Sequence, residues 1–216
     1  MSHLLRLIED ELSRDAAHPE SLPPLDRVLY VARGELEVRP GGEGPVRLGE
    51  NAARHCAGPL AVRAGRAGAR VLRFELIRLP SPPTGGGLVL LEHSIALDEQ
   101  AKYLMRCDRV DFDPGGVALP HRHRGGGIRC LLKGELKVTV GEAPGRVIRP
   151  GEAWFESGRE PVLAEASTAE ETSFVRVSIL PLEIRGQSSI IYVKPEDARR
   201  GRPRRYTVLV DEPIVI

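Results

Sequence analysis

The sequence contains an internal repeat, and this repeat limits the possible folds more than any other feature does. Residues 27–38 (RVLYVARGELEV) match residues 127–138 (GIRCLLKGELKV), and residues 45–50 (PVRLGE) match residues 147–152 (VIRPGE). The spacing between the two copies stays at roughly 100 residues. Self-similarity at a constant spacing indicates that one structural unit occurs twice in the chain.

Each copy is predicted to consist of short β-strands joined by tight turns. Residues 135–140 (ELKVTV) alternate between polar and apolar side chains, which is typical of a strand with one buried and one solvated face. The 216 residues include 23 glycines and 18 prolines, so turns are frequent. Short strands without interleaved helices favour a β-sandwich or barrel over a parallel α/β sheet.

Charge, hydropathy and cysteine spacing exclude several classes of protein. The 31 Lys and Arg residues against 30 Asp and Glu residues give a net charge of +1, which argues against nucleic-acid or anionic-membrane binding. The longest apolar run, residues 88–91, is far shorter than the ~18 residues that span a bilayer, and acids interrupt the N-terminus where a signal peptide would be apolar. Three cysteines without CxxC spacing indicate neither a disulfide framework nor a cysteine zinc site. We therefore expect a cytoplasmic protein without a nucleic-acid or membrane partner.

The chain is predicted to have four segments. Residues 1–20 form a helical segment, residues 21–84 a first β-unit, residues 85–181 a second β-unit, and residues 182–216 a C-terminal β extension. The helix is predicted from apolar residues at helical spacing, namely Leu4, Leu5, Ile8 and Leu12. Terminal elements of this kind often cover sheet edges or exchange between subunits, so we expect a homodimer.

Two histidines in the second copy are the first candidates for chemistry. His121 and His123 lie two residues apart on a predicted strand, so their side chains point to the same face. Two imidazoles on one face are a natural start for a transition-metal site. Zn, Fe, Mn and Ni normally take three or four protein ligands, so two histidines do not fill such a site.

The surrounding residues resemble the two motifs of the cupin superfamily. The matching residues are Gly116, His121 and His123, followed by GEL at residues 134–136 and PGE at residues 150–152. Together with the repeat, this resemblance implies a bicupin, an all-β protein of two double-stranded β-helix (jelly-roll) units over about residues 26–181.

The resemblance also implies metal ligands, of which this sequence keeps only part. Cupin motifs usually add a Glu three or four residues after the second His, and here Gly126 and Gly127 occupy those positions. The further His of the second motif falls at or near Val162. In the first copy the histidine positions fall near Ser21 and Pro23, so the first cupin unit is expected to be degenerate and structural.

Glu156 is the candidate for a third metal ligand. It lies in residues 153–156 (AWFE), on the strand that crosses the mouth of the barrel in cupins. If it points inward, two histidines and one carboxylate suit Fe(II), Mn(II) or Zn(II) with open positions, and the carboxylate can alternatively act as a general base. The other interpretation is a Glu at the rim paired with an arginine.

Arg129 and Trp154 are candidates for substrate binding. Strand alternation from Gly127 places Arg129 on the inward face, where the two glycines would clear space and the guanidinium could hold the carboxylate of an organic acid. The alternatives are that Arg129 faces solvent or is neutralised by Glu156. Trp154 lies in the core or at the mouth, where an aromatic lining would suit a small organic ligand.

Three functions remain open from the sequence. The first is a metal-dependent cupin enzyme (dioxygenase, isomerase or decarboxylase type) that acts on a small organic acid. In it His121, His123 and Glu156 hold a divalent Fe, Mn, Ni or Zn ion and Arg129 anchors the substrate. The second is a non-catalytic bicupin that binds or senses a small molecule with a remnant metal site. The third is a structural bicupin whose histidines form internal hydrogen bonds. The fold alone does not choose among them.

Overall fold

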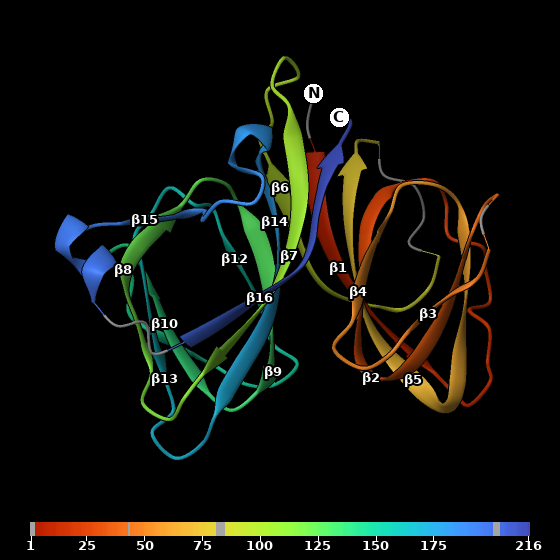
Figure 1. Cartoon of the computed structure of the whole chain (residues 1–216), viewed down its shortest axis with the longest axis horizontal. Helices are drawn as coiled ribbons and strands as arrows, with labels where there is room; N and C mark the ends of the chain where they lie inside the picture. Colours follow the sequence, from red (N-terminus) through yellow and green to blue (C-terminus); the bar gives the residue numbers. More distant parts are fainter. Residues whose placement is uncertain (1–2, 43, 81–84, 201–203) are drawn as a thin grey trace. The chain divides into compact units, whose positions relative to one another are not determined.

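The computed structural model describes residues 3–42, 44–80, 85–200 and 204–216, and its regular structure is almost entirely antiparallel β-sheet (Figure 1). No α-helix occurs among these residues; the helical turns are two short 3-10 segments, Leu182–Ile184 and Pro195–Arg199. The all-β fold class is confirmed. The chain divides into two compact units, one of residues up to Ala101 together with Ile216 and one of Lys102–Val215.

The first unit is built on one sheet with the strand order β3-β2-β5-β1-β6, and β4 pairs with β2. Its strands are β1 (His3–Leu12), β2 (Asp26–Pro40), β3 (Val46–Leu48), β4 (Ala53–Cys56), β5 (Leu60–Arg78) and β6 (Leu88–Ile95). The long strands β2 and β5 curl around a core to which both contribute, including Leu29, Leu36 and Leu60.

The predicted N-terminal helix is wrong, because residues 3–12 form strand β1. This strand pairs with β5 over its whole length and with β6 on its other edge. Leu5, Leu7 and Ile8 are fully buried, so the apolar run is covered on both faces of the sheet. A strand that is buried on both faces is apolar at most of its positions, so some of its residues also match helical spacing. Pairing with two neighbouring strands outweighs this local helical pattern.

The second unit has two five-stranded sheets that enclose one core. One sheet has the order β12-β9-β14-β7-β16 and the other β11-β10-β13-β8-β15. In chain order the strands are β7 (Tyr103–Phe112), β8 (Val117–His123), β9 (Gly127–Lys133), β10 (Leu136–Val140), β11 (Arg146–Ile148), β12 (Ala153–Glu156), β13 (Val162–Ala166), β14 (Thr172–Pro181), β15 (Ile190–Tyr192) and β16 (Arg204–Ile214). The core takes Leu131, Trp154 and Phe174 from the first sheet and Leu136 and Val162 from the second.

Two strand pairings of the first unit have similar pairings in the second unit. Ile8 lies opposite Arg73 between β1 and β5, and Asp108 lies opposite Arg176 between β7 and β14. β6 pairs with β1 in the first unit as β16 pairs with β7 in the second. Strand β8, which carries the histidines, has only a weak counterpart: residues 13–25 make two isolated bridges, at Ala17 and Leu22.

The first unit extends beyond the predicted boundary at residues 84–85. β6 follows the proline- and glycine-rich segment and pairs with β1, so this strand belongs to the first unit. Residues 81–84 of the segment are outside the described part of the chain. The C-terminal extension supplies β15 and β16, which form an edge of each sheet of the second unit.

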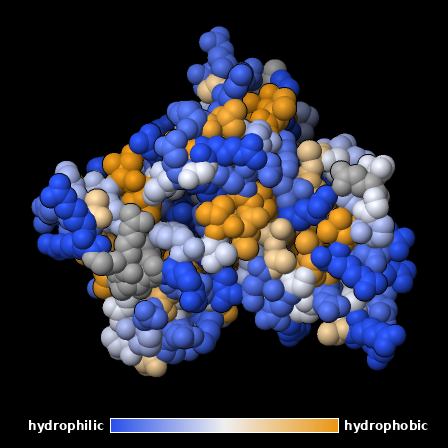
Figure 2. Space-filling model, viewed as in Figure 1, coloured by the Kyte–Doolittle hydropathy of each residue, from blue (hydrophilic) through white to orange (hydrophobic). Residues whose placement is uncertain are grey.

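The surface seen in Figure 2 is hydrophilic over most of its area, with hydrophobic residues in small separate patches. Among the described residues, no helix is long and apolar enough to cross a membrane.

Candidate functional site

The two histidines of β8 lie together in the interior of the second unit. His121 and His123 are 5% and 6% exposed, and their ring centroids are 4.8 Å apart in an edge-to-face arrangement. Their i, i+2 spacing on a strand therefore places both rings on one buried face, as the alternation of side chains along a strand requires.

Hydrogen bonds fix the orientation of both rings. Nδ1 of His121 lies 2.7 Å from the carbonyl oxygen of Leu119. Nε2 of His123 lies 3.3 Å from Nη1 of Arg176, and Nδ1 of His123 lies 3.3 Å from Oγ of Ser189. Because a guanidinium only donates, Nε2 of His123 is the acceptor in the contact with Arg176, which leaves Nδ1 to donate to Oγ of Ser189.

Glu156 points inward but is held by two neighbours. Its Oε2 lies 2.7 Å from Nη2 of Arg129, and its Oε1 accepts a 2.8 Å hydrogen bond from Nε1 of Trp154. Oε2 also lies 3.6 Å from Nε2 of His123. Strand pairing produces this group, because Trp154 lies directly opposite Arg129 between β12 and β9.

Arg129 is the inward-facing arginine of β9, and Glu156 neutralises it. Burial lowers the pKa of Arg129 to about 10 even though Glu156 acts to raise it, so the guanidinium stays charged at neutral pH. The side chain is 1% exposed, and its charge is used in an internal ion pair. This geometry agrees with the alternative left open by the sequence, in which Glu156 neutralises Arg129.

The space expected at the two glycines is absent. A Cβ atom on Gly127 would lie 2.3 Å from the carbonyl oxygen of Val177, and a Cβ atom on Gly126 would lie 3.1 Å from Cζ of Phe155. The prediction that these glycines clear room beside Arg129 is therefore wrong. At Gly127 the room is taken by the backbone of β14, and at Gly126 by the ring of Phe155.

Sequence reasoning missed the charged pair that completes this cluster. Nε of Arg176 on β14 donates to Oδ2 of Asp108 on β7 over 2.8 Å, and both residues are buried. Burial alone would lower the pKa of Arg176, but the attraction of Asp108 raises it above its usual value. The signal in the sequence was a single arginine within the apolar run of residues 174–181 (FVRVSILP).

A pocket of about 320 Å³ borders this cluster. Its lining includes Arg176 and Asp108 from the barrel, Ser189 and Ile190 from the C-terminal extension, and Tyr206 from β16. The guanidinium carbon of Arg176 lies 5.5 Å from the centroid of the Tyr206 ring, within the range of a cation–π contact. Arg129, Trp154 and Glu156 are not among its lining residues.

The donor atoms of His121, His123 and Glu156 do not fit a resident divalent metal. Nε2 of His123 accepts from a cation, and both carboxylate oxygens of Glu156 are engaged by Arg129 and Trp154. Within the described ranges, no group of three or more His, Cys, Asp or Glu side chains could hold a metal ion. Metal binding by these three residues stays a prediction.

The interior of the first unit is charged but lacks a histidine pair. Arg73 occupies the register position of Arg176, and its Nε and Nη2 bind the two oxygens of Asp10 at 2.8 and 3.0 Å. Glu75 accepts from Nη1 of Arg73 at 2.9 Å and from Nε of Arg27 at 3.2 Å. His18 lies 3.7 Å from Asp10, measured between Nε2 and Oδ1. Internal ion pairs therefore fill the interior of this unit.

His18 gives the first unit a pH-dependent contribution to stability. The carboxylate of Asp10 raises the pKa of His18 above its ordinary value of 6.5, although burial acts in the opposite direction. A raised folded-state pKa adds stability that is fully present below pH 6.5 and is lost as the pH rises through the folded value. We expect the free energy of unfolding to fall between pH 5.5 and pH 8.5 by more in the native chain than in His18→Gln. Urea titrations at both pH values measure the difference, and equal pH dependence in the two proteins would contradict it.

Comparison with known proteins gives matches among solved structures only. No protein-family model matches the chain, and no curated protein matches it. The similar structures include oxalate decarboxylase from Bacillus subtilis at pH 4.6, with 11% identity over 93% of this chain and 79% of that chain and a TM-score of 0.66. AerE from Microcystis aeruginosa matches with 14% identity over 82% and 88% of the two chains and a TM-score of 0.60. A cupin 2 conserved barrel domain protein from Leptotrichia buccalis matches with 16% identity over 82% and 84% and a TM-score of 0.50.

These likenesses show the fold, and the expectation of a cupin fold is confirmed. The chain is an all-β protein with the cupin fold.

Proposed function

We propose that this chain is a bicupin of small-molecule metabolism whose second unit binds a small organic acid. The corresponding strand order and the equivalent register positions of Arg73 and Arg176 support the duplication. The first unit is the degenerate one, because Asp10, Glu75 and Arg27 fill its interior with ion pairs.

The observation that carries the proposal is the guanidinium of Arg176 in the wall of the pocket. Its Nε is bound to Asp108 and its Nη1 to His123, and among the described residues Nη2 has no partner. Nη2 therefore keeps two N–H donors for a ligand in a buried environment, where a charge-assisted hydrogen bond to a carboxylate is strong.

The rest of the pocket suits the body of a small acid. Tyr206, Ile190 and Val208 supply apolar surface, and Ser189 supplies a hydroxyl group beside His123. A volume of about 320 Å³ lies at the lower end of the range for small-molecule sites. The name of one structural neighbour, oxalate decarboxylase, makes a dicarboxylate a sensible first probe.

Binding rather than catalysis follows from the position of Glu156. A general base must reach the bound molecule, and Glu156 is not among the residues that line the pocket. In this proposal Arg129 and Trp154 act on the ligand only indirectly, since they fix Glu156 beside His123. The bound acid is held by Arg176.

Calorimetric titration with oxalate, malonate and benzoate tests the proposal. We expect saturable binding of at least one of these acids to the native chain, and a loss of roughly tenfold or more in affinity for Arg176→Gln, because one charge-assisted contact is removed. Lys133→Gln removes an equal charge from an exposed ion pair of the same unit and should bind like the native chain.

A second variant tests the pocket without removing a buried charge, because Arg176→Gln could lose binding by misfolding. Val208 lines the pocket but is 56% exposed, so Val208→Trp should fill the pocket without disturbing the buried charges. We expect Val208→Trp to unfold like the native chain and to lose binding. If none of the three acids binds the native chain saturably, or if Val208→Trp binds the acid as the native chain does, the proposal fails.

A further inference from the structure

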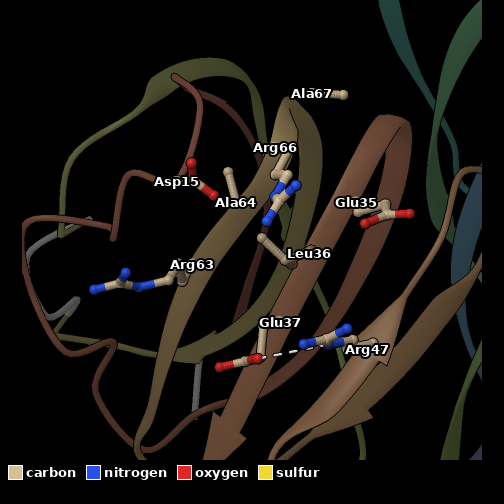
Figure 3. A pocket seen from close by; sticks show the side chains of 10 residues that line it. Asp15, Glu35, Leu36, Glu37, Arg47, Arg63, Ala64, Arg66 and Ala67 are labelled. Atoms are coloured by element: carbon tan, nitrogen blue, oxygen red, sulfur yellow. Dashed lines mark ion pairs between the residues drawn. The ribbon is translucent and has the colours of Figure 1, made fainter.

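The first unit carries a separate pocket of about 620 Å³ that the proposed function does not use. Its walls come from β2, β3 and β5, with Asp15 from the segment that follows β1. Figure 3 shows Arg66 and Arg47 extending into it from opposite sides of Leu36, with Glu37 beside Arg47.

A bulge in β5 produces this pocket. Leu36 pairs with Ala64 and Gly34 pairs with Ala69, so residues 65–68 of β5 loop out opposite a single residue of β2. The loop requires glycine at residue 34, where φ is +81° and a Cβ atom would lie 2.1 Å from the carbonyl oxygen of Gly68. Small residues at 64, 65 and 67 leave the hollow open, and the loop presents Arg66 to it.

The pocket lining has three acidic residues and three arginines, and two of the acids are paired with arginines outside the lining. Glu37 is held by Arg39 at 2.7 Å, so its contact with Arg47 is a looser 3.7 Å. Asp15 is paired with Arg14 at 3.3 Å.

Arg66 and Arg63 are both unmatched cations of the pocket lining. In the part of the chain that the structure describes, neither has an ion pair or a hydrogen bond to a side chain, and Figure 3 shows Arg63 extending away from Leu36. Glu35 lies at one end of the pocket in Figure 3, away from Arg66. The space above Leu36 is therefore bordered by one unmatched guanidinium and one loosely matched guanidinium.

We infer that this pocket binds a small molecule through an oxyanion group, a carboxylate or a phosphate, held between Arg66 and Arg47. A planar guanidinium donates two parallel hydrogen bonds to such a group, and two guanidinium groups on opposite walls fix its position. The site belongs to the first unit alone and does not depend on the acid site of the second unit.

NMR titration of the full chain with inorganic phosphate and with malonate tests this inference. We expect saturable shifts of the Arg66 and Arg47 Nε–Hε signals, and an affinity roughly tenfold lower in Arg66→Gln. Arg33→Gln, which removes an exposed arginine paired with Glu11, should leave the affinity unchanged. Added salt should weaken binding, because the side chains are close to solvent.

The outcomes separate the two kinds of oxyanion. Saturation by phosphate alone assigns a phosphate-bearing ligand, and saturation by malonate alone assigns a carboxylate-bearing one. Unsaturable shifts spread over many arginines, or equal affinity in Arg66→Gln and the native chain, would overturn the inference. Malonate bound at this site would also add heat to the calorimetric titrations, so the native chain and Val208→Trp are compared there in the Arg66→Gln background. In that background the two proposals fail independently.

Discussion

Replacing Arg129 by methionine is expected to lower the free energy of unfolding of the second unit by about 3–5 kcal/mol. The substitution leaves the carboxylate of Glu156 buried, with its 2.7 Å cationic partner removed. Trp154 still donates one hydrogen bond to it, but a neutral donor does not balance a buried charge. Trp154 is the one tryptophan of the chain, so its fluorescence during urea unfolding reports on this unit specifically.

Two further variants show whether the cost comes from the unpaired charge. Arg129→Met combined with Glu156→Gln removes both charges, keeps an acceptor for Trp154, and should recover most of the lost stability. Lys133→Met breaks an ion pair with Glu171 whose side chains are 57% and 69% exposed, so it should cost less than about 1 kcal/mol. A cost for Arg129→Met no larger than that of Lys133→Met would contradict the buried ion pair.

The sequence predicts the β class of the fold because both copies of the repeat contain turn glycines and alternating polar and apolar residues. Matching turn glycines and strand alternation in residues 27–38 and 127–138 indicate the β class, which the strand pairing confirms, while the duplication of one unit stays a prediction. The N-terminal strand was missed because Leu4, Leu5, Ile8 and Leu12 have helical spacing, whereas the strand conformation comes from the pairing of β1 with both β5 and β6. Long-range pairing of this kind leaves no local pattern.

Part of the candidate site could likewise be predicted from the sequence, and part of it could not. His121 and His123 could be placed on one face by counting along a single strand. The partner of Glu156 depends on the register between β12 and β9, and the pairing of Arg176 with Asp108 joins strands that are 68 residues apart in sequence. A lone arginine in an apolar strand indicates a buried cation, but the residue that balances it cannot be identified without the sheet.

Gly127→Ala is expected to lower the free energy of unfolding by about 3 kcal/mol, a large effect for one methyl group. The added Cβ would lie 2.3 Å from the carbonyl oxygen of Val177 and 2.8 Å from Cα of Ser178. Both are backbone atoms of β14, and β9 is held between β14 and β12, so neither neighbour can move away without breaking pairing. Urea unfolding followed by Trp154 fluorescence measures the loss.

Gly126→Ala is the matched control for this substitution. Its Cβ would meet the end of the Phe155 ring at 3.1 Å, and a ring edge can shift by a few tenths of an ångström, so the cost should be about 1 kcal/mol. Equal stability of Gly127→Ala and the native chain would show that room exists at residue 127 after all.

The same geometry determines what Gly127→Glu can do. This variant installs the carboxylate that the cupin motif usually carries near the histidine pair, but its Cβ meets the same atoms of β14. We expect it to unfold at lower urea concentration than Gly127→Ala and to bind no more Zn(II) than the native chain, measured by metal analysis after dialysis. Stoichiometric zinc retained by folded Gly127→Glu would contradict this. The backbone of β14 occupies the space that a side chain at residue 127 would need, so one substitution cannot restore the carboxylate ligand there.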